Sequence, residues 1–235
     1  MSKNIIIDGL TVPFQEGQTI MDAAMAAGLY IPHLCHNPEF KPHGSCKLCT
    51  VNVNGRNVAS CTMPAAEGQQ VLNDIAELNA ERLALTQMLF VEGNHLCPAC
   101  EKSGNCNLQG VAYYLGMMSP HYNHFYPARE VDASHPDILL DRNRCIYCEL
   151  CVRASRDVDG KNVFGLTDRG IMTRLIVNAT SGLLGDTSLA ATDKAAQVCP
   201  TGALLVKRKG FAVPIGSRIF DRHTIKDVQT GGSHE

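Results

Sequence analysis

Residues 95–106 hold more potential metal ligands than an ordinary packing role requires. The segment HLCPACEKSGNC contains three thiols and one imidazole within twelve residues. Cys97 and Cys100 are three positions apart, so a single turn can direct both thiols to one metal centre. A polar, glycine-containing bend then returns the chain at Cys106, and a neutral His95 can supply a fourth bond. These four residues (the 95–106 set) are compatible with a structural zinc site or an iron–sulfur cluster.

A second group of cysteines has the spacing of a cubane site. Cys145, Cys148 and Cys151 are separated by two residues each, and Cys199 stands before a proline far downstream (together the 145–199 set). Three thiolates so close in sequence can hold three corners of a [4Fe–4S] cluster, and the distant cysteine completes the fourth. Zinc sites usually use two separated pairs instead. Ser155 stands where two-cluster ferredoxins carry another cysteine, so a single cluster is predicted here.

The remaining cysteines are Cys35, Cys46, Cys49 and Cys61 (the 35–61 set). The middle two keep the two-residue spacing of plant-type ferredoxins, whereas ten residues separate the first two instead of four. Small or flexible residues at 44–47 have amides that can reach bridging sulfides. This set predicts a [2Fe–2S] cluster, with a four-thiolate zinc site as the alternative.

The number of ligands supports the cluster interpretation. Eleven cysteines and His95 divide into three sets of four with no thiol left over. Such a division would be a coincidence if the cysteines were small core residues. It favours a [4Fe–4S] cluster at the 95–106 set also, although only the missing fourth thiol argues for His95. We therefore expect one [2Fe–2S] and two [4Fe–4S] clusters. No NAD or flavin site is expected, because no G-x-G-x-x-G follows a predicted strand.

Composition limits the class of protein. A chain of 235 residues allows one large domain or two to three small ones. Its net charge of −2 provides no basic surface for nucleic acid or a membrane. The apolar runs are too short to cross a bilayer, and no signal peptide is recognisable. We therefore expect a cytoplasmic protein, in which thiols stay reduced and many cysteines indicate metal or redox chemistry.

The pattern of turns and apolar residues predicts an α+β fold. Asp8–Gly9 is a hairpin turn signal, and Thr19 can cap a short helix that Gly28 ends. A hairpin followed by a helix is typical of small β-grasp domains. The predicted elements are strand–turn–strand over 3–11, helices over 20–27, 74–90, 108–118 and 192–198, a hairpin over 50–60, and strands over 70–73 and 175–177.

Several side chains outside the ligand sets also carry expectations. In the helix over 74–90, Leu78, Leu85 and Leu89 share a face and Arg82 lies at its edge. Residues 119–136 are expected to form a long loop with exposed or locally bonded histidines at positions 121, 124 and 135. Arginines 142, 144, 153 and 156 surround the Cys145 loop, where they either offset the charge of a cluster or form a solvated basic or docking face.

The predicted domain organisation follows the ligand sets. It comprises a β-grasp [2Fe–2S] domain (1–74), a helical [4Fe–4S] domain with one His and three Cys ligands (75–136), a [4Fe–4S] domain with four Cys ligands (137–210) and a partly disordered tail (211–235). The chain from Gly210 onward is expected to be extended, with the disorder at its last residues.

The ligand motifs resemble those of a known family. The 35–61 set, HLCPACEKSGNCNLQG, and CIYCELC with CPTGAL are similar to the N-terminal cluster region of the complex I 75-kDa-type subunit and of iron-only hydrogenases. The short His-x-Cys spacing and the VPIGSR tail are most similar to the HoxU family, the diaphorase small subunits of soluble NAD-linked nickel–iron hydrogenases. The resemblance implies the same three clusters, with the His-ligated one in the middle of the sequence.

The resemblance also implies partners. It predicts an obligate hetero-oligomer in which electrons pass between a flavin-bearing, NADH-reactive diaphorase subunit and a hydrogenase small subunit. No substrate site is recognisable, so we expect this chain to relay single electrons while the partners perform hydride chemistry and hydrogen activation. The alternatives are the relay subunit of an NAD-linked formate dehydrogenase, iron-only hydrogenase or complex I-type assembly. A zinc-stabilised binding module and a self-sufficient redox enzyme remain as other classes.

Overall fold

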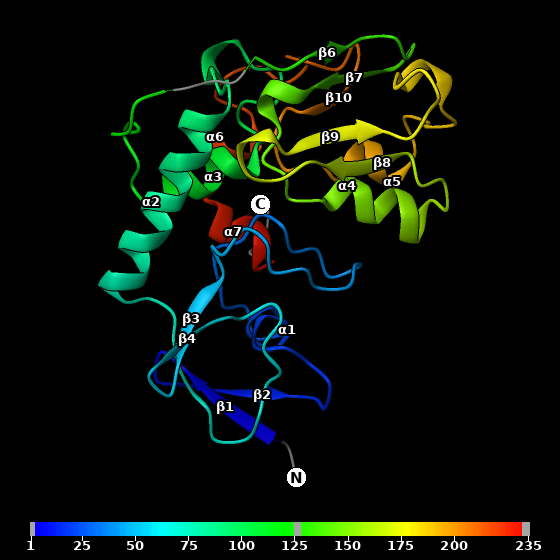
Figure 1. Ribbon diagram of the computed structural model, residues 1–235. Coiled ribbons are helices and arrows are strands. Elements are labelled where there is room, and N and C mark those ends of the chain that lie inside the picture. The colour runs from blue at the N-terminus through cyan, green and yellow to red at the C-terminus, as the bar shows by residue number, and fades with distance from the viewer. Residues whose placement is uncertain (1–2, 125–127, 232–235) are drawn as a thin grey trace. The chain divides into compact units, whose positions relative to one another are not determined.

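The chain folds into two compact units in the computed structural model, which describes residues 3–124 and 128–231 (Figure 1). The first unit contains the described residues up to Thr86, together with Val111–Met118 and the described residues from His223. The second contains Gln87–Gly110 and the described residues of Ser119–Arg222. The division into three domains and a tail stays a prediction. No helix within the described ranges is long and apolar enough to cross a bilayer.

A five-stranded mixed sheet forms the framework of the first unit, with the order β2-β1-β5-β3-β4. Its two hairpin turns, at Asp8–Gly9 and Asn54–Gly55, have the positive φ angles that type I′ turns require, so both predicted hairpins are confirmed. The strand predicted over 70–73 is present as β5. The strands are β1 (Lys3–Ile7), β2 (Leu10–Phe14), β3 (Thr50–Val53), β4 (Arg56–Ala59) and β5 (Gln70–Leu72), of which only the β1–β5 pair is parallel.

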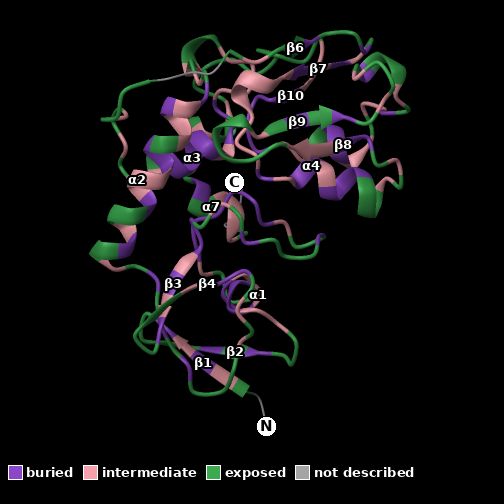
Figure 2. Ribbon diagram, in the orientation of Figure 1, coloured by how far each residue is buried: buried purple, intermediate pink, exposed green. Residues whose placement is uncertain are grey.

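Helix α1 (Ile20–Ala26) packs its apolar residues into the core of this unit. Thr19 and Asp22 form the capping box that starts it, and Gly28, with φ +70°, follows its end. The predicted helix over 20–27 is therefore confirmed, and Figure 2 shows α1 as largely buried. Alternate strand residues such as Ile5, which is fully buried, complete the same core.

Helix α2 (Ala76–Glu92) confirms the helix predicted over 74–90 but not the position of Arg82. That side chain is not at the edge of an apolar face, because it is only 2% exposed. Its Nε donates to the carbonyl oxygen of Leu48 at 3.1 Å, and its terminal nitrogens donate to those of Asn73 and Thr50 at 2.8 Å each. The guanidinium is thus buried with its donors bonded to three main-chain carbonyl oxygens.

The second unit contains two small sheets, with the orders β10-β7-β6 and β8-β9. Only β9 was predicted from sequence. Helix α4 packs beside β8, and helix α5 packs beside β10 (Figure 1). The bounds are β6 (Val131–Asp132), β7 (Ile138–Asp141), β8 (Phe164–Thr167), β9 (Arg174–Val177), β10 (Leu204–Val206), α4 (Leu150–Arg153) and α5 (Lys194–Gln197). The helices predicted over 108–118 and 192–198 are present but shorter, as α3 (Asn107–Tyr114) and α5.

The loop predicted over 119–136 is present only in part, because it contains β6, and residues 125–127 lie outside the described part. His121 and His124 are exposed, which is the first of the two alternatives predicted for the histidines of this loop. His135 is buried and takes the second alternative, a local hydrogen bond. Its Nε2 lies 2.8 Å from the carbonyl oxygen of Leu189, and its Nδ1 accepts a 3.0 Å hydrogen bond from the amide of Asp137.

The tail is more ordered than predicted. Residues 219–229 contain the helices α6 (Ile219–Arg222) and α7 (Ile225–Gln229), so an extended tail from 210 onward is wrong for this stretch. Thr224 and Asp227 form a second capping box, and Ile225 is 1% exposed. This Thr-x-x-Asp signal is present in the sequence and was overlooked. The predicted disorder at the last residues falls on 232–235, outside the described residues.

Candidate metal centres

All eleven cysteines lie in the described part of the chain, and none of them forms a disulfide. Among the described residues, no three His, Cys, Asp or Glu side chains converge closely enough to hold one metal ion. A group larger than one ion requires donors that are spread around a wider space, and each set can be tested for that arrangement.

The 35–61 set brings its thiols together in the first unit. Sγ of Cys49 lies 3.4 Å from Sγ of Cys61, and the amide of Cys46 donates to Sγ of Cys35 at 3.5 Å. Lys47, with φ +58°, bends the loop that carries the two central cysteines. The negative charge of a Cys35 thiolate influences the other three sulfurs electrostatically. The four predicted ligands therefore face one another.

Hydrogen bonding prepares two of these thiols for metal binding. A hydrogen bond with Cys46 lowers the pKa of Cys35 to about 4, and one with Cys61 lowers the pKa of Cys49 to about 7. The same bonds raise the pKa of Cys46 and Cys61. Four thiolates this close together repel one another unless a cationic centre lies between them. The donor chemistry fits a [2Fe–2S] cluster.

The 95–106 set surrounds a hollow of about 290 Å³ in the second unit. All four predicted ligands line it, together with Phe90, Gln109 and Gly202. The short helical turn Cys97–Ala99 carries the first thiol and is followed directly by Cys100, and Cys106 precedes the first turn of α3. The segment predicted to wrap round a metal centre therefore does enclose a space.

His95 is neutral and has a buried ring nitrogen without a hydrogen-bond partner, two properties that fit a metal ligand. Its Nε2 is buried and has no hydrogen-bond partner, which is costly for a polar atom unless something binds it. Burial lowers the pKa of His95 to about 4, so the imidazole is neutral at pH 7 and can offer a lone pair. The single residue between it and Cys97, Leu96, has φ −77° and ψ 81°, without a left-handed bend. Burial also raises the pKa of Cys106 to about 12.

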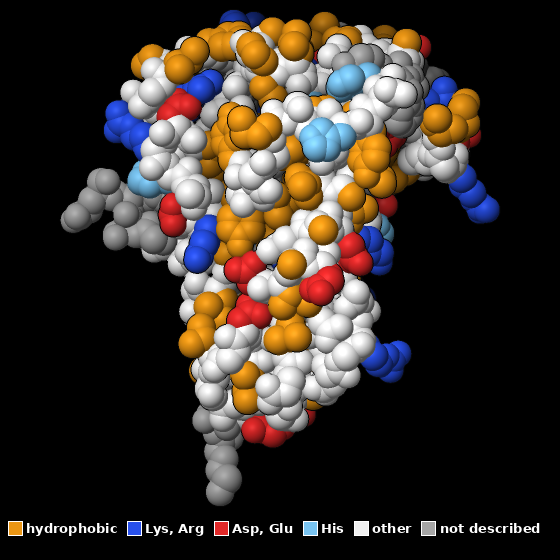
Figure 3. Space-filling view, turned by 90° about the vertical axis from the view of Figure 1, so that its left-hand side faces the viewer, with side chains coloured by type: hydrophobic (Ala, Val, Ile, Leu, Met, Phe, Trp, Pro, Cys, Tyr) orange, Lys and Arg blue, Asp and Glu red, His pale blue; other side chains and the backbone are white. Residues whose placement is uncertain are grey.

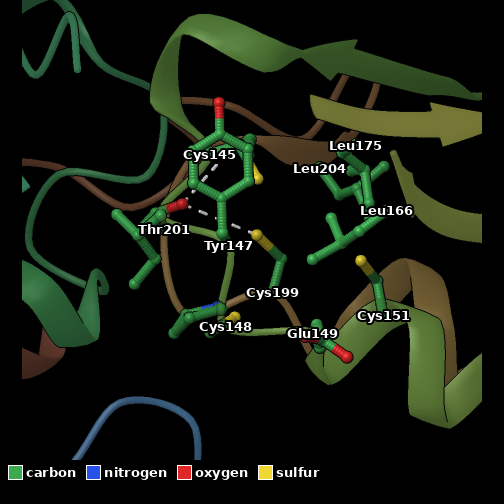
Figure 4. A pocket seen from close by; sticks show the side chains of 13 residues that line it. Cys145, Tyr147, Cys148, Glu149, Cys151, Leu166, Leu175, Cys199, Thr201 and Leu204 are labelled. Carbon is green, nitrogen blue, oxygen red and sulfur yellow. Dashed lines mark hydrogen bonds between the residues drawn. The ribbon is translucent and has the colours of Figure 1, made fainter. Parts of the chain in front are cut away.

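The 145–199 set surrounds a second hollow, of about 370 Å³. Figure 4 shows the four cysteines around a common space, with Leu166, Leu175 and Leu204 on its apolar side. Tyr147 and Glu149, between the cysteines, have φ of +52° and +58°. These left-handed residues turn the short loop so that all three of its thiols reach the hollow.

The thiols of this set are also costly to ionise without a metal. Burial raises the pKa of Cys145 to about 12 and raises that of Cys151 as well. A centre that replaces the protons would remove this cost. Oγ1 of Thr201 lies 3.6 Å from Sγ of Cys199 and is the polar neighbour of that ligand.

The four arginines near the Cys145 loop do not act as one group. Arg153 is buried and donates to the carbonyl oxygen of Cys148 at 3.4 Å. Arg142 donates to the carbonyl oxygen of Leu175, and Arg156 is exposed and pairs with Asp157. Neither a shared neutralising cluster nor a continuous basic face results. The fourth arginine, at position 144, contacts Sγ of Cys100.

Sequence reasoning missed three residues that shape the 95–106 set. A Cβ on Gly202 would lie 2.9 Å from Sγ of Cys100, and one on Gly93 would lie 2.4 Å from Nε2 of His95. Oε1 of Gln109 accepts the amide of Gly104 at 2.7 Å and holds the bend before Cys106. Gly202 acts on a cysteine far away in the sequence, whereas Gly93 and Gln109 act on residues within five positions of them that no spacing rule marks.

Comparison with known families assigns each region. Residues 3–74 match a 2Fe-2S iron-sulfur cluster binding domain, and residues 138–206 match a 4Fe-4S single cluster domain. Between them, residues 82–121 match the NADH-ubiquinone oxidoreductase-G iron-sulfur binding region. The chain therefore contains both 2Fe-2S and 4Fe-4S binding domains with mixed α/β content.

Relatives extend over nearly the whole chain. It is 39% identical to "NAD-reducing hydrogenase HoxS subunit gamma" of Cupriavidus necator, over 96% of both chains. A chain of the crystal structure of an NAD⁺-reducing [NiFe]-hydrogenase in the H₂-reduced state superposes with a TM-score of 0.94, at 52% identity and 98% coverage of this chain and 99% of that one.

Longer proteins share only part of their length with this chain. It is 32% identical to the NADPH-Fe(3+) oxidoreductase subunit alpha of Geobacter sulfurreducens, over 87% of this chain but 24% of that protein. The 78 kDa subunit of the mitochondrial NADH-ubiquinone oxidoreductase of Candida albicans is 32% identical, over 88% of this chain and 29% of its own length. The chain thus spans about a quarter to a third of these relatives.

Proposed function

The chain belongs to the family of iron–sulfur subunits that includes the gamma subunit of the NAD-reducing hydrogenase HoxS, and from this membership we propose that it relays single electrons between a flavin-bearing, NADH-reactive diaphorase subunit and the small subunit of a [NiFe] hydrogenase. The observation that carries the proposal is the 39% identity over 96% of both chains. The chain is then part of an NAD-linked hydrogen dehydrogenase, an oxidoreductase whose hydride and hydrogen chemistry takes place on other chains.

The proposed cofactors are one [2Fe–2S] and two [4Fe–4S] clusters, which supply one-electron transfer when bound. The 35–61 set would hold the first, in a β-grasp domain, and the 95–106 and 145–199 sets would hold the other two. Support comes from the hollows that each of the latter sets lines with all four predicted donors. His95 is proposed as a ligand because its buried Nε2 has no hydrogen-bond partner.

The proposed partners follow from the same family and from the surface. Phe211, Val213 and Ile215 are 66%, 51% and 85% exposed, and hydrophobic side chains are visible on the face that Figure 3 draws. Apolar surface of this kind is typical of protein interfaces. An obligate hetero-oligomer in the cytoplasm is therefore part of the proposal.

A second candidate is the relay region of an NAD-linked formate dehydrogenase, an iron-only hydrogenase or a complex I-type assembly. The lengths of the relatives favour the first candidate, because the chain covers 96% of the HoxS gamma subunit but 29% of the Candida subunit. Mass spectrometry of the assembly purified through this chain separates them. A [NiFe] hydrogenase small subunit is expected, and a formate dehydrogenase or complex I subunit in its place would contradict the proposal.

The decisive experiment on the cofactors is iron and sulfide analysis with EPR of the full chain purified anaerobically. One two-iron and two four-iron clusters give about ten iron atoms per chain. A value near four or six would remove at least one assignment. Zinc without iron would favour the binding-module class instead, and turnover of NADH or hydrogen by the isolated chain would favour a self-sufficient enzyme.

A further inference from the structure

The side chain of Arg144 reaches the neighbouring ligand set. Arg144 directly precedes Cys145, but its Nη1 lies 3.6 Å from Sγ of Cys100 and donates to it. The same Nη1 donates to Oε2 of Glu101 at 2.8 Å, and Nε lies 3.0 Å from Oδ2 of Asp141. The side chain is 19% exposed. Its planar guanidinium is therefore held in one orientation, where solvent screens its charge only weakly.

The main chain of Arg144 is linked to the 145–199 set through Thr201. Its carbonyl oxygen accepts a 2.8 Å hydrogen bond from Oγ1 of Thr201. That hydroxyl lies 3.6 Å from Sγ of Cys199, and Thr201 is 1% exposed. One residue thus contacts a donor of the 95–106 set through its side chain and is connected to a donor of the 145–199 set through its backbone.

The approach of the guanidinium to sulfur depends on a glycine. A Cβ on Gly202 would lie 2.9 Å from Sγ of Cys100 and 3.3 Å from Nη1 of Arg144. Any side chain there would occupy the space in which the N–H and the sulfur meet. The contact is therefore built into the packing of this unit and is not a chance orientation of a surface arginine.

We propose that Arg144 is a positioning residue that raises the reduction potential of the cluster held by the 95–106 set. The proposal rests on the proposed function, because it requires that cluster. A cationic N–H donor beside a ligand sulfur stabilises the reduced form, which carries one more negative charge. Removal of the cation therefore makes reduction harder.

The two carboxylates beside Arg144 give the proposal a sign test. Glu101 and Asp141 hold the guanidinium in place, and their negative charges oppose its effect on the cluster. Loss of the Glu101 charge should make reduction easier, whereas loss of the Arg144 charge should make it harder. A role limited to packing predicts no such opposition, because both substitutions would simply loosen the same contact.

The test is an anaerobic redox titration followed by EPR, on the full chain with its clusters in the assembly it forms. Arg144→Gln should shift the midpoint of the His95-ligated cluster to more negative values, by more than it shifts the other two midpoints. Glu101→Gln should shift the same midpoint to more positive values, and Arg144→Lys, which keeps the charge, should recover part of the loss. Arg174→Gln removes an exposed arginine paired with Asp168 and is the matched control.

Opposite shifts from Arg144→Gln and Glu101→Gln, each larger than that of the control, support the proposal. The proposal is overturned if the midpoint of the His95-ligated cluster shifts no further in either variant than in the control, or if it shifts in the same direction in both variants. The cluster assignment stands in either case. A wild-type chain without two [4Fe–4S] signals overturns the proposed function as well. Should Arg144→Gln fail to assemble, Arg144→Lys takes its place beside Glu101→Gln. A negative shift in the first and a positive shift in the second support the role, and shifts of one sign, or none, overturn it.

Discussion

The imidazole of His95 folds back over Gly93, so that a Cβ added at Gly93 would lie only 2.4 Å from Nε2 of His95. The same Cβ would lie 3.0 Å from the carbonyl oxygen of Asn143. A side chain at position 93 and the observed orientation of the imidazole therefore exclude each other. His95 also lines the hollow of the 95–106 set, so a side chain at position 93 would force the imidazole to move within that hollow.

The first prediction is that Gly93→Ala displaces the His95 donor. We expect the EPR signal of one [4Fe–4S] cluster to change or disappear, and the other two signals to remain, because the clash is local. The matched control is Gly165→Ala, where a Cβ meets nothing closer than 3.5 Å. An unchanged spectrum in Gly93→Ala would show that the imidazole has room to move or is not a ligand.

The second prediction concerns His95 itself. His95→Ala should alter one of the three EPR components, since it removes a single donor from one set. His95→Cys should keep a four-iron cluster, with a midpoint potential below that of the wild type, because a thiolate adds negative charge where the imidazole was neutral. Iron content and a redox titration measure both effects. Three unchanged components in His95→Ala would rule out His95 as a ligand.

Features encoded by neighbouring residues could be predicted from the sequence. Asp8–Gly9 and Asn54–Gly55 specify their hairpins, and the Thr19 capping box starts α1, because each signal acts over at most three positions. The short strands β7 and β10 gave no such signal, since each is stabilised by a partner more than sixty positions away.

The ligand types and their grouping were predictable for a different reason. Metal chemistry restricts the donors to Cys and His, and spacing limits which of them can share a centre. The residues that shape the hollows were not predictable. Gly202 acts on Cys100 from a distant position, and no local pattern distinguishes it from other glycines. Arg144 was expected beside the Cys145 loop, but its side chain contacts Cys100 instead, which no spacing in the sequence indicates.

The third prediction is that Arg82 is required for the stability of the first unit. Arg82→Met removes donors to the carbonyl oxygens of Leu48, Asn73 and Thr50 and leaves these buried groups unpaired. We expect the free energy of unfolding to fall by about 3 kcal/mol or more. Urea denaturation of the full chain, followed by circular dichroism, measures it. Arg56→Met, at an exposed position of β4, is the control, and equal effects of the two substitutions would contradict this role.

The last prediction is a pH dependence set by His33. Burial lowers the pKa of His33 to about 4 in the folded chain, whereas an unfolded chain has a histidine pKa of about 6.5. Between these pH values the imidazole is protonated in the unfolded state but not in the folded state. The contribution of His33 to the free energy of unfolding is therefore fully present above about pH 6.5, falls as the pH decreases toward 4, and changes little below that. The difference of the two pKa values corresponds to about 3 kcal/mol.

The matched variant is His33→Asn, whose amide can still reach the carbonyl oxygen of Ile31 that His33 Nδ1 contacts at 2.8 Å. The urea midpoints of both proteins are measured anaerobically from pH 7.5 to 4.5. The difference between the two proteins reports the effect of His33, because the effect of acid on all other groups is common to both. The wild type should lose more stability than the variant over that range. Parallel curves would mean that the protonation of His33 is not linked to unfolding, because the proton would then bind both states equally well.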